Sequence, residues 1–218
     1  MNRIVENYLR LKKELDEYGV DLIVVSKGQP IEAIRAIYEA GHRDFGENRV
    51  QELRKKKTEL PEDIRWHMIG HLQTNKIKYL IPWIYMIQSV DRDSLMHELN
   101  KRVEKHNTTV SCLIEVHIAK EESKHGMTIE QVYEFFETEQ YNNYPNLKFV
   151  GLMGMATYTD DTTLIRNEFR TLRKIFEDIK KTFSDFKHLS MGMSNDYKIA
   201  IEEGTTMVRI GSLIFAEE

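Results

Sequence analysis

Short runs of apolar residues alternate along the chain with longer segments in which apolar residues recur at helical spacing. Several of the runs are apolar at successive positions, which is typical of strands that are covered on both faces. The pattern therefore favours a parallel sheet with helices on its outside. The predicted strands are LIVV (22–25), a weak DFG (44–46), WHMIG (66–70), IYMIQSV (84–90), SCLIEVHI (111–118), FVGLMGMAT (149–157), HLSMG (188–192) and MVRIGSLIF (207–215).

Helical segments lie between these runs and also before the first one. Asp91 and Ser194 are candidate N-caps of the segments that follow them, and Gly204 stands where a helix should end. Eight strands that alternate with helices predict an α/β fold, a (β/α)8 TIM-type barrel in a single domain over residues 1–218. An open doubly wound sheet of similar content is the alternative. The predicted helices span 3–18, 31–40, 48–57, 74–81, 92–106, 128–139, 162–183 and 194–203.

The composition narrows the class of protein only slightly. Hydrophobic residues make up 41% of the 218 residues and charged residues 30%, as in ordinary soluble domains. The net charge of −4 argues against a nucleic-acid binder. The single cysteine, Cys112, excludes an intrachain disulfide, and the sequence shows neither a signal peptide nor an apolar run long enough to span a membrane. We therefore expect a cytoplasmic protein without a nucleic-acid or membrane partner.

Lys27 is the first residue with candidate chemistry. It follows the apolar run LIVV, which delivers Ser26 and Lys27 to the carboxyl end of the first predicted strand. Sites in α/β folds form at that edge of the sheet. A lysine amine that points inward loses hydration, which favours its neutral form and makes it a nucleophile for an aldehyde. The alternative is that Lys27 simply leaves the strand for solvent.

Two further segments carry polar candidates at predicted strand ends. Asn48 stands at a junction between strand and helix, where it either caps the helix or directs its amide into the site. His67 and His71 are four residues apart, but no cysteine or acidic ligand accompanies them in the sequence. We therefore expect core or rim histidines there and no metal site.

The last two strand ends resemble a phosphate site. Ser190, Gly192, Met193 and Ser194 form a turn of mostly small residues before a helix, and such turns suit a phosphate dianion. Arg209 lies within an otherwise apolar strand and therefore needs a buried partner.

Gly211 and Ser212 follow Arg209 at the end of the same strand. A phosphate site built from the last two strand-to-helix loops is a recurrent feature of barrels. The alternative is that these residues only make turns while Arg209 pairs with a core carboxylate. Taken together with Lys27, they describe a site for a phosphorylated aldehyde such as pyridoxal 5′-phosphate.

The sequence also resembles a known family, the pyridoxal phosphate homeostasis proteins, which share the barrel domain of alanine racemase. WHMIGHLQTNK and LSMGMSNDY are the longest and most specific of the matching segments. The matches run along the whole chain: LIVVSK (22–27), DFGENRVQEL (44–53), WHMIGHLQTNK (66–76), IQSVD (87–91), EESKHGMT (121–128), GLMGMAT (151–157), LSMGMSNDYKIAIEEG (189–204) and VRIGSLIF (208–215).

The resemblance implies a barrel like the N-terminal domain of alanine racemase, with an extra N-terminal helix. It implies that Lys27 is the Schiff-base lysine and that Arg209 donates to the ring nitrogen of the cofactor. It further implies that Ser194, Gly211 and Ser212 contact the phosphate. The residues themselves suggest the same roles.

Three more residues are implied as cofactor contacts. Asn48 is similar to an asparagine near the cofactor, Met155 falls where related racemases pack a side chain on the ring, and Met193 contributes through its main chain. The departures from the family pattern are Gly28 and Gln29 after the lysine, and Ala216, Glu217 and Glu218 at the end of the chain, where the altered charge affects how the tail packs.

The resemblance leaves open whether the protein is a carrier or an enzyme. Arg209 is a permanent donor, so it favours an unprotonated ring nitrogen that withdraws electrons weakly. A racemase also needs a second acid or base opposite the first, which that family takes from a C-terminal domain that we do not expect here. We therefore expect a carrier that buffers or delivers pyridoxal phosphate, influences vitamin B6 metabolism and has no catalytic residues. The alternative is a low-activity racemase or related enzyme in which Tyr158 or a histidine acts as the opposite base.

The expected partners are pyridoxal phosphate itself and apoenzymes that depend on it. Without the second domain of the racemases we expect a monomer, although the N-terminal helix offers a surface for a weak dimer. A third interpretation is an interaction module that uses the acidic helix near 130–139 and binds no cofactor.

Overall fold

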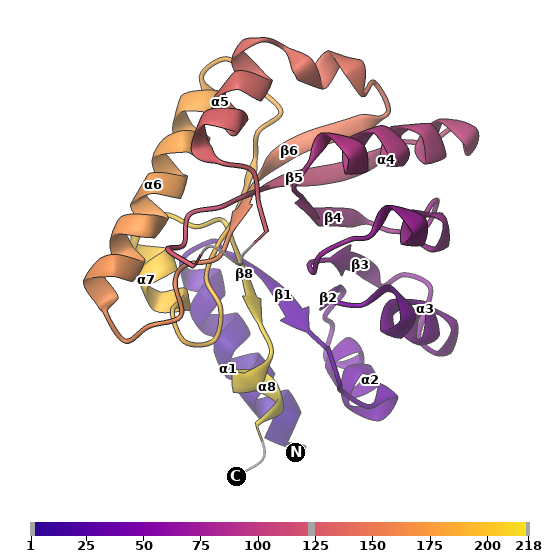
Figure 1. Ribbon diagram of the computed structural model, residues 1–218. Coiled ribbons are helices and arrows are strands. Elements are labelled where there is room, and N and C mark those ends of the chain that lie inside the picture. The colour runs from indigo at the N-terminus through magenta and orange to yellow at the C-terminus, as the bar shows by residue number, and fades with distance from the viewer. Residues whose placement is uncertain (1–2, 122–124, 217–218) are drawn as a thin grey trace.

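The computed structural model describes residues 3–121 and 125–216 (Figure 1). Residues 122–124 of the EESKHGMT match and the terminal residues Glu217 and Glu218 lie outside the described residues. Eight parallel strands close into a barrel in sequence order, and β8 pairs with β1 to complete it. The strands are β1 Asp21–Val25, β2 Asp44–Glu47, β3 Arg65–Met68, β4 Met86–Val90, β5 Val110–Val116, β6 Leu147–Gly154, β7 His188–Ser190 and β8 Met207–Ile210.

The closed barrel confirms the predicted fold and makes the open-sheet alternative wrong. The weak DFG segment is a full member of the barrel, because β2 pairs with both β1 and β3. The helices surround the strands as α1 Arg3–Glu17, α2 Ile31–Glu39, α3 Val50–Glu59, η1 Thr74–Tyr79, α4 Asp93–Lys105, α5 Ile129–Glu137, η2 Gln140–Asn143, α6 Thr162–Lys180, α7 Tyr197–Glu202 and α8 Ser212–Phe215, of which η1 and η2 are 3-10 helices.

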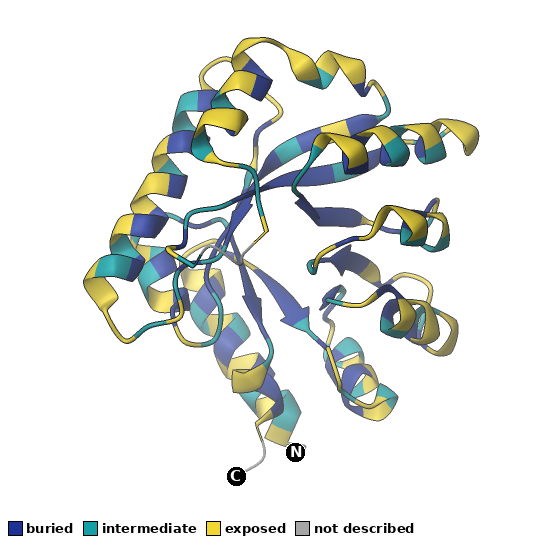
Figure 2. Ribbon diagram, viewed as in Figure 1, coloured by how far each residue is buried: buried dark blue, intermediate teal, exposed yellow. Residues whose placement is uncertain are grey.

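The strands are mostly buried, and each of the longer helices buries one stripe of its surface (Figure 2). In α6, for example, Ile165, Phe169, Leu172 and Phe176 recur at helical spacing and face the strands. The inside of the barrel is filled differently. A small apolar cluster of Met86, Leu113 and Met153 lies there beside buried polar side chains, and these side chains matter for the site below.

Helix α1 packs against its own chain through Tyr8, Leu11 and Leu15, which are buried. At its two ends the amide of Asn7 donates to the carbonyl of Ile214 at 3.3 Å, and the Tyr197 hydroxyl lies 3.3 Å from the Glu14 carboxylate. The apolar face of α1 therefore packs against other parts of the same chain. No described helix combines the length and the apolar character that crossing a bilayer requires.

Two predicted N-caps are wrong. The N-cap of α4 is Arg92, because the Asp91 carboxylate instead contacts the side chains of Arg92 and His71. Helix α7 begins only after a turn over 194–196, and its N-cap is Asp196 rather than Ser194. The predicted stop at Gly204 is confirmed, since α7 ends at Glu202 and Gly204 has a φ of +81°.

Two other boundaries differ from the prediction. The run 207–215 is not one strand: β8 ends at Ile210, and the last four residues of the run, Ser212–Phe215, form α8. The helix predicted at 74–81 is a 3-10 helix, η1. Both segments lie on the loops and ends of the barrel, where tertiary packing rather than apolar content decides the local conformation.

Candidate functional site

A cavity of about 990 Å³ opens at the carboxyl ends of the strands, lined by the ends of β1 and β8 and mainly by the connections that follow β1, β2, β6, β7 and β8. Its volume falls in the range of small-molecule sites. All eight cofactor residues predicted from the sequence line it: Lys27, Asn48, Met155, Met193, Ser194, Arg209, Gly211 and Ser212. The barrel thus gathers in one place residues that are spread over most of the chain.

Lys27 lies two residues beyond β1 and is exposed in the wall of the cavity, so the amine is not buried as an inward-pointing lysine would be. Hydrogen bonds to Glu47 and Glu52 hold the residues before and after Lys27. The Ser26 hydroxyl donates to Glu47 at 2.6 Å, and the Gly28 amide donates to Glu52 at 3.0 Å. Both contacts restrict the position of the backbone that carries Lys27.

A buried ion pair supports this arrangement. The Lys56 ammonium contacts Glu47 and donates to the main-chain oxygen of Ser26 at 2.7 Å. Burial raises the pKa of the Glu47 carboxyl, against the lowering effect of Lys56 and Ser26. Among the described residues, the second oxygen of Glu47, Oε2, has no hydrogen-bond partner.

Sequence reasoning missed this pair. Its signal is the spacing in α3, where Lys56 follows Val50 and Leu53 at apolar positions of the helix and is buried like them.

Asn48 follows β2 and faces the cavity rather than capping the next helix, since the N-cap of α3 is Arg49. Gly70 lies directly behind Asn48. A Cβ atom at Gly70 would come within 2.5 Å of the main-chain oxygen of Asn48, so only glycine fits. This close approach sets the position of Asn48 at the edge of the cavity.

The predicted phosphate turn forms one wall of the cavity. Gly192 has a φ of +100°, which starts the turn, and the Met193 amide donates to the Asp196 carboxylate at 2.6 Å. The main-chain N–H of Met193 is therefore already paired within the turn. On the neighbouring strand, a Cβ atom at Gly211 would lie 2.7 Å from the main-chain oxygen of Val25, so the ends of β8 and β1 approach closely there.

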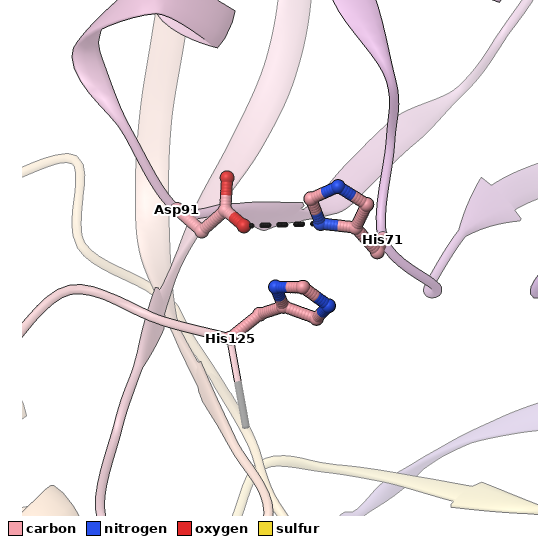
Figure 3. A group of neighbouring side chains, drawn as sticks. All are labelled: His71, Asp91 and His125. Carbon is pink, nitrogen blue, oxygen red and sulfur yellow. Dashed lines mark ion pairs between the residues drawn. The ribbon is translucent and has the colours of Figure 1, made fainter. Parts of the chain in front are cut away.

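The histidines 67 and 71 have separate environments. His67 is buried inside the barrel, as expected of a core histidine. His71 is exposed at the rim, where it lies 3.3 Å from Asp91 and where its ring stacks on that of His125 (Figure 3). The prediction that no acidic ligand accompanies the pair is therefore wrong for His71, because β4 brings Asp91 to it from the next connection.

Arg209 is buried and reaches the cavity from inside the barrel. Its Nη1 donates to the main-chain oxygen of Ser190 at 2.8 Å and to the Ser190 hydroxyl at 2.6 Å, and its Nη2 donates to the main-chain oxygen of Gly154 at 3.0 Å. Burial lowers the pKa of the guanidinium to about 10, which still leaves it protonated at neutral pH. The core carboxylate expected in the alternative interpretation is not among these hydrogen-bond partners.

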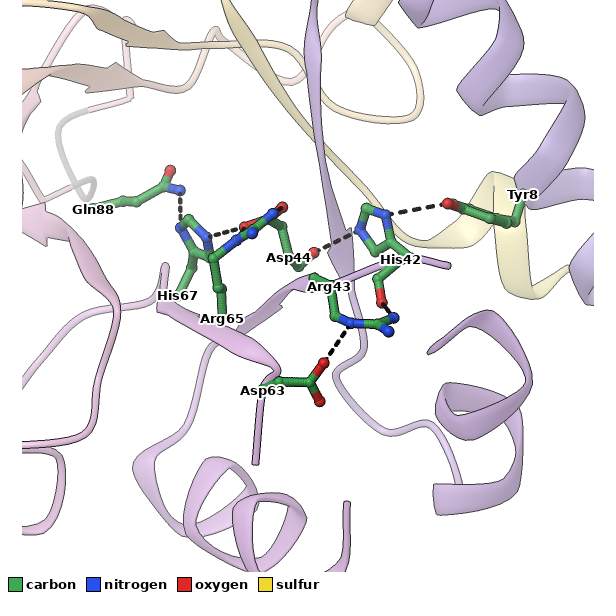
Figure 4. A network of polar contacts seen from close by, with 8 residues as sticks. All are labelled: Tyr8, His42, Arg43, Asp44, Asp63, Arg65, His67 and Gln88. Atoms are coloured by element: carbon green, nitrogen blue, oxygen red, sulfur yellow. Dashed lines mark hydrogen bonds and ion pairs between the residues drawn. The ribbon is translucent and has the colours of Figure 1, made fainter. Parts of the chain in front are cut away.

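A directed chain of hydrogen bonds continues from Arg209 to the opposite end of the barrel. The Ser190 hydroxyl donates to Gln88 at 2.7 Å, and the Gln88 amide lies 3.1 Å from His67 Nδ1. His67 Nε2 in turn lies 3.2 Å from Asp44, which also binds Arg65 (Figure 4).

The donors and acceptors assign one protonation pattern to this chain. Because the Gln88 amide nitrogen can only donate, His67 Nδ1 accepts, and Nε2 carries the proton toward Asp44. Burial acts to raise the pKa of Asp44, but the hydrogen bonds from Arg65 and His67 hold it well below its ordinary value. The chain therefore fixes the orientation of the Ser190 hydroxyl and, through it, of Arg209.

Glu115 is a buried carboxyl near the same guanidinium. Burial and, to a smaller extent, the charge of Asp91 raise its pKa to about 7, although Arg209 partly offsets both. The folded protein therefore holds this proton more tightly than the unfolded chain does. The resulting stabilisation is fully present below the unfolded value of 4.5 and is lost as the pH rises through about 7.

Replacing Glu115 with glutamine is expected to remove this dependence on pH. The wild type should lose about 3 kcal/mol from this group between acidic and mildly alkaline pH, whereas Glu115→Gln should not. Urea unfolding of both proteins across that interval measures the difference. The same dependence of the free energy of unfolding on pH in both proteins would contradict the assignment of this effect to Glu115.

The residues present fit a pyridoxal phosphate group. One cavity wall offers an exposed amine at Lys27, another offers the hydroxyls of Ser194 and Ser212 beside the close approach at Gly211, and Arg209 supplies a fixed cationic donor. An amine, a set of small hydroxyl residues and a donor are the complement of an aldehyde, a phosphate and a ring nitrogen.

Comparison with known proteins agrees with the fold and with the family that the sequence resembles. Residues 1–218 match the family described as alanine racemase, N-terminal domain. The chain is 41% identical to the pyridoxal phosphate homeostasis protein of Aquifex aeolicus, covering 100% of this chain and 96% of the relative. It is 34% identical to the human protein of the same name, covering 99% of this chain and 82% of the relative. The chain therefore belongs to the alanine racemase N-terminal domain family and, within it, to the pyridoxal phosphate homeostasis proteins.

Solved structures show the same architecture. PipY of Synechococcus elongatus without pyridoxal phosphate superposes with a TM-score of 0.90 at 31% identity, covering 98% of this chain and 100% of PipY. PipY with pyridoxal phosphate bound has a TM-score of 0.87 at 32% identity, with the same two coverages. An alanine racemase of Clostridium difficile shares the fold at a TM-score of 0.78 and 10% identity, and this chain covers 56% of it.

Proposed function

We propose that this protein holds pyridoxal phosphate in the cavity at the carboxyl ends of its strands and buffers or delivers it within the cell. The observation that carries the proposal is that all eight residues predicted to contact the cofactor line one cavity. The names of the relatives and the pyridoxal phosphate bound to PipY support the same ligand.

Each part of the ligand has a counterpart in the cavity. Lys27 would bind the aldehyde carbon covalently through its amine, and Ser194, Gly211 and Ser212 would bind the phosphate. Arg209 would donate to the ring nitrogen. Asn48, Met155 and Met193 would form the remaining walls.

Pyridoxal phosphate supplies an aldehyde that condenses with amines and a ring that withdraws electrons from the attached group. Arg209 limits the second property here. Its guanidinium is protonated and held by three hydrogen bonds, so it can donate to the ring nitrogen but cannot deliver a proton that stays there. The arrangement favours storage of the ligand over catalysis.

An enzyme remains the second candidate because Tyr158 lines the same cavity. Its side chain is 85% exposed, and its main-chain amide donates to the Glu121 carboxylate at 3.1 Å. A phenol so exposed to water is a poor general acid or base catalyst unless another group closes over it and excludes the solvent. We therefore favour a carrier over an enzyme. We further propose that the carrier is a monomer in the cytoplasm, and that apoenzymes that depend on pyridoxal phosphate receive the ligand from it.

One experiment separates the two functions. The protein is loaded with pyridoxal phosphate, freed of excess ligand by gel filtration, and incubated with several amino acids in deuterium oxide. The carrier is expected to retain the ligand through gel filtration and to exchange α-protons no faster than free pyridoxal phosphate does. Rapid exchange that is lost in Tyr158→Phe would establish the enzyme instead, and failure to retain the ligand would contradict both.

A further inference from the structure

Three potential metal ligands meet at the rim of the barrel (Figure 3). His71 follows β3, Asp91 follows β4, and His125 lies in the connection between β5 and α5. One ligand atom of each residue lies within 4.8 Å of those of the other two. We propose that His71, Asp91 and His125 together bind a divalent transition-metal ion of the class that prefers imidazole ligands, such as zinc.

The spacing of the ligand atoms suits such an ion. Zinc binds imidazole nitrogen and carboxylate oxygen at about 2.0–2.2 Å, so neighbouring ligand atoms in a tetrahedral site lie about 3.3 Å apart. His71 Nδ1 and Asp91 Oδ2 are separated by 3.3 Å. The ligand atom of His125 lies within 4.8 Å of the other two, and rotation of its exposed side chain would bring it to bonding distance.

The two imidazoles lie against each other at the rim of the barrel. Their rings stack with centroids 3.9 Å apart and planes inclined by 21°. An imidazole nitrogen binds a metal ion in the plane of its own ring, so the exposed His125 ring turns out of this stack when both nitrogens bind one ion. A cation between these rings and Asp91 would satisfy all three groups at once.

Asp91 is held in the orientation that a ligand requires. Its side chain is 5% exposed, and its Oδ1 accepts a hydrogen bond from Nη1 of Arg92. Nη2 of the same arginine donates to the main-chain oxygen of Leu72 at 2.9 Å, next to His71. Arg92 therefore fixes Asp91 relative to His71 and leaves Oδ2 directed at the imidazole, as supporting residues of metal sites do.

The position of the cluster gives the ion a structural role. His125 and Met155 both line a small pocket beside the cluster, and Met155 also lines the proposed cofactor cavity. A bound ion would tie the connection between β5 and α5 to the ends of β3 and β4 at the side of that cavity. Three protein ligands would leave a further position for water or an anion. None of the three ligands belongs to the proposed pyridoxal phosphate contacts, so the two sites share no ligand residue.

Titration of the full-length, metal-free chain without an affinity tag tests the proposal, with zinc followed by calorimetry and cobalt by its visible absorption. The wild type is expected to bind one zinc ion and to give cobalt the intense spectrum of a tetrahedral site. His71→Ala and His125→Ala should each weaken zinc binding by more than about 100-fold, and Arg92→Ala by about 10- to 100-fold. The exposed His106, removed in His106→Ala, is the matched control and should leave the affinity unchanged.

Two results would overturn the proposal. The first is a zinc affinity that is equal in the wild type and in the His71→Ala/His125→Ala double variant. The second is a wild-type cobalt spectrum that shows only the weak bands of octahedral, water-bound cobalt. The second result is decisive even where a variant fails to fold, because it needs only the wild type.

Discussion

Replacing Lys56 with methionine is expected to lower the free energy of unfolding by about 3–5 kcal/mol at neutral pH, the range for breaking a buried ion pair. The side chain is 6% exposed, and its ammonium is the cationic partner of Glu47, whose side chain is fully buried. Methionine fills similar space but leaves the carboxylate without its cation. One oxygen of Glu47 already has no hydrogen-bond partner among the described residues, so little is left to compensate.

The loss should depend on pH in a defined direction. Burial already raises the pKa of Glu47, and removing Lys56 raises it further. The folded variant then favours protonated Glu47. Protonation of this carboxyl contributes to the free energy of unfolding at low pH, and the contribution is lost as the pH rises through the raised pKa. Urea unfolding should therefore show a larger difference between Lys56→Met and wild type in mildly alkaline than in acidic buffer.

Two controls make this result specific. Lys55→Met alters an exposed lysine of the same helix and should change stability by less than about 0.5 kcal/mol. The double variant Lys56→Met/Glu47→Leu removes both charges and should regain most of the loss. A loss that does not depend on pH, or that persists in the double variant, would show that Lys56 acts through packing alone.

Replacing Arg209 with methionine is expected to weaken binding of pyridoxal phosphate by about 10- to 150-fold, which corresponds to losing one hydrogen bond from a charged donor. The guanidinium is held by Ser190 and Gly154 in the wall of the cavity, so a donor is preorganised there before the ligand arrives. Preorganisation lowers the cost of binding and makes the loss of this donor large.

Equilibrium binding of pyridoxal phosphate measures the effect. Arg102→Met, which changes a partly exposed arginine on α4, is the control and should bind like the wild type. Circular dichroism confirms that the Arg209→Met variant folds. A folded variant with unchanged affinity would show that Arg209 does not contact the ligand and serves only the polar chain inside the barrel.

Much of the fold was predictable because a strand buried on both faces leaves a contiguous apolar run. This signal is weak only for β2, where DFG is short and its pairing with β1 and β3 completes the strand. The errors in the prediction lie where a local sequence pattern is compatible with two different structures. Asp91 has the residue type of an N-cap, but His71 and Arg92 bind its carboxylate instead. The run ending at Phe215 changes from strand to helix at Gly211, where β8 approaches β1 too closely for a side chain.

The residues of the site also fall into those that the sequence predicts and those that it does not. Lys27 and Arg209 were predictable because a charged residue within or just after an apolar run is unusual and stands at a strand end. The pairing of Glu47 with Lys56 was not predictable: the spacing in α3 indicates that Lys56 is buried, but its partner is defined only when β2 and α3 pack together. The group formed by His71, Asp91 and His125 comes from three separate connections, and only the closed barrel brings them together.

The covalent attachment of pyridoxal phosphate tests the central claim most directly. The protein is incubated with the ligand, treated with borohydride, digested and examined by mass spectrometry, beside Lys27→Ala treated in the same way. We expect the wild type to carry the reduced ligand on the peptide that contains Lys27, and the variant to carry none. Modification spread over surface lysines in both proteins, or no modification in the wild type, would contradict the proposal that this cavity holds pyridoxal phosphate through Lys27.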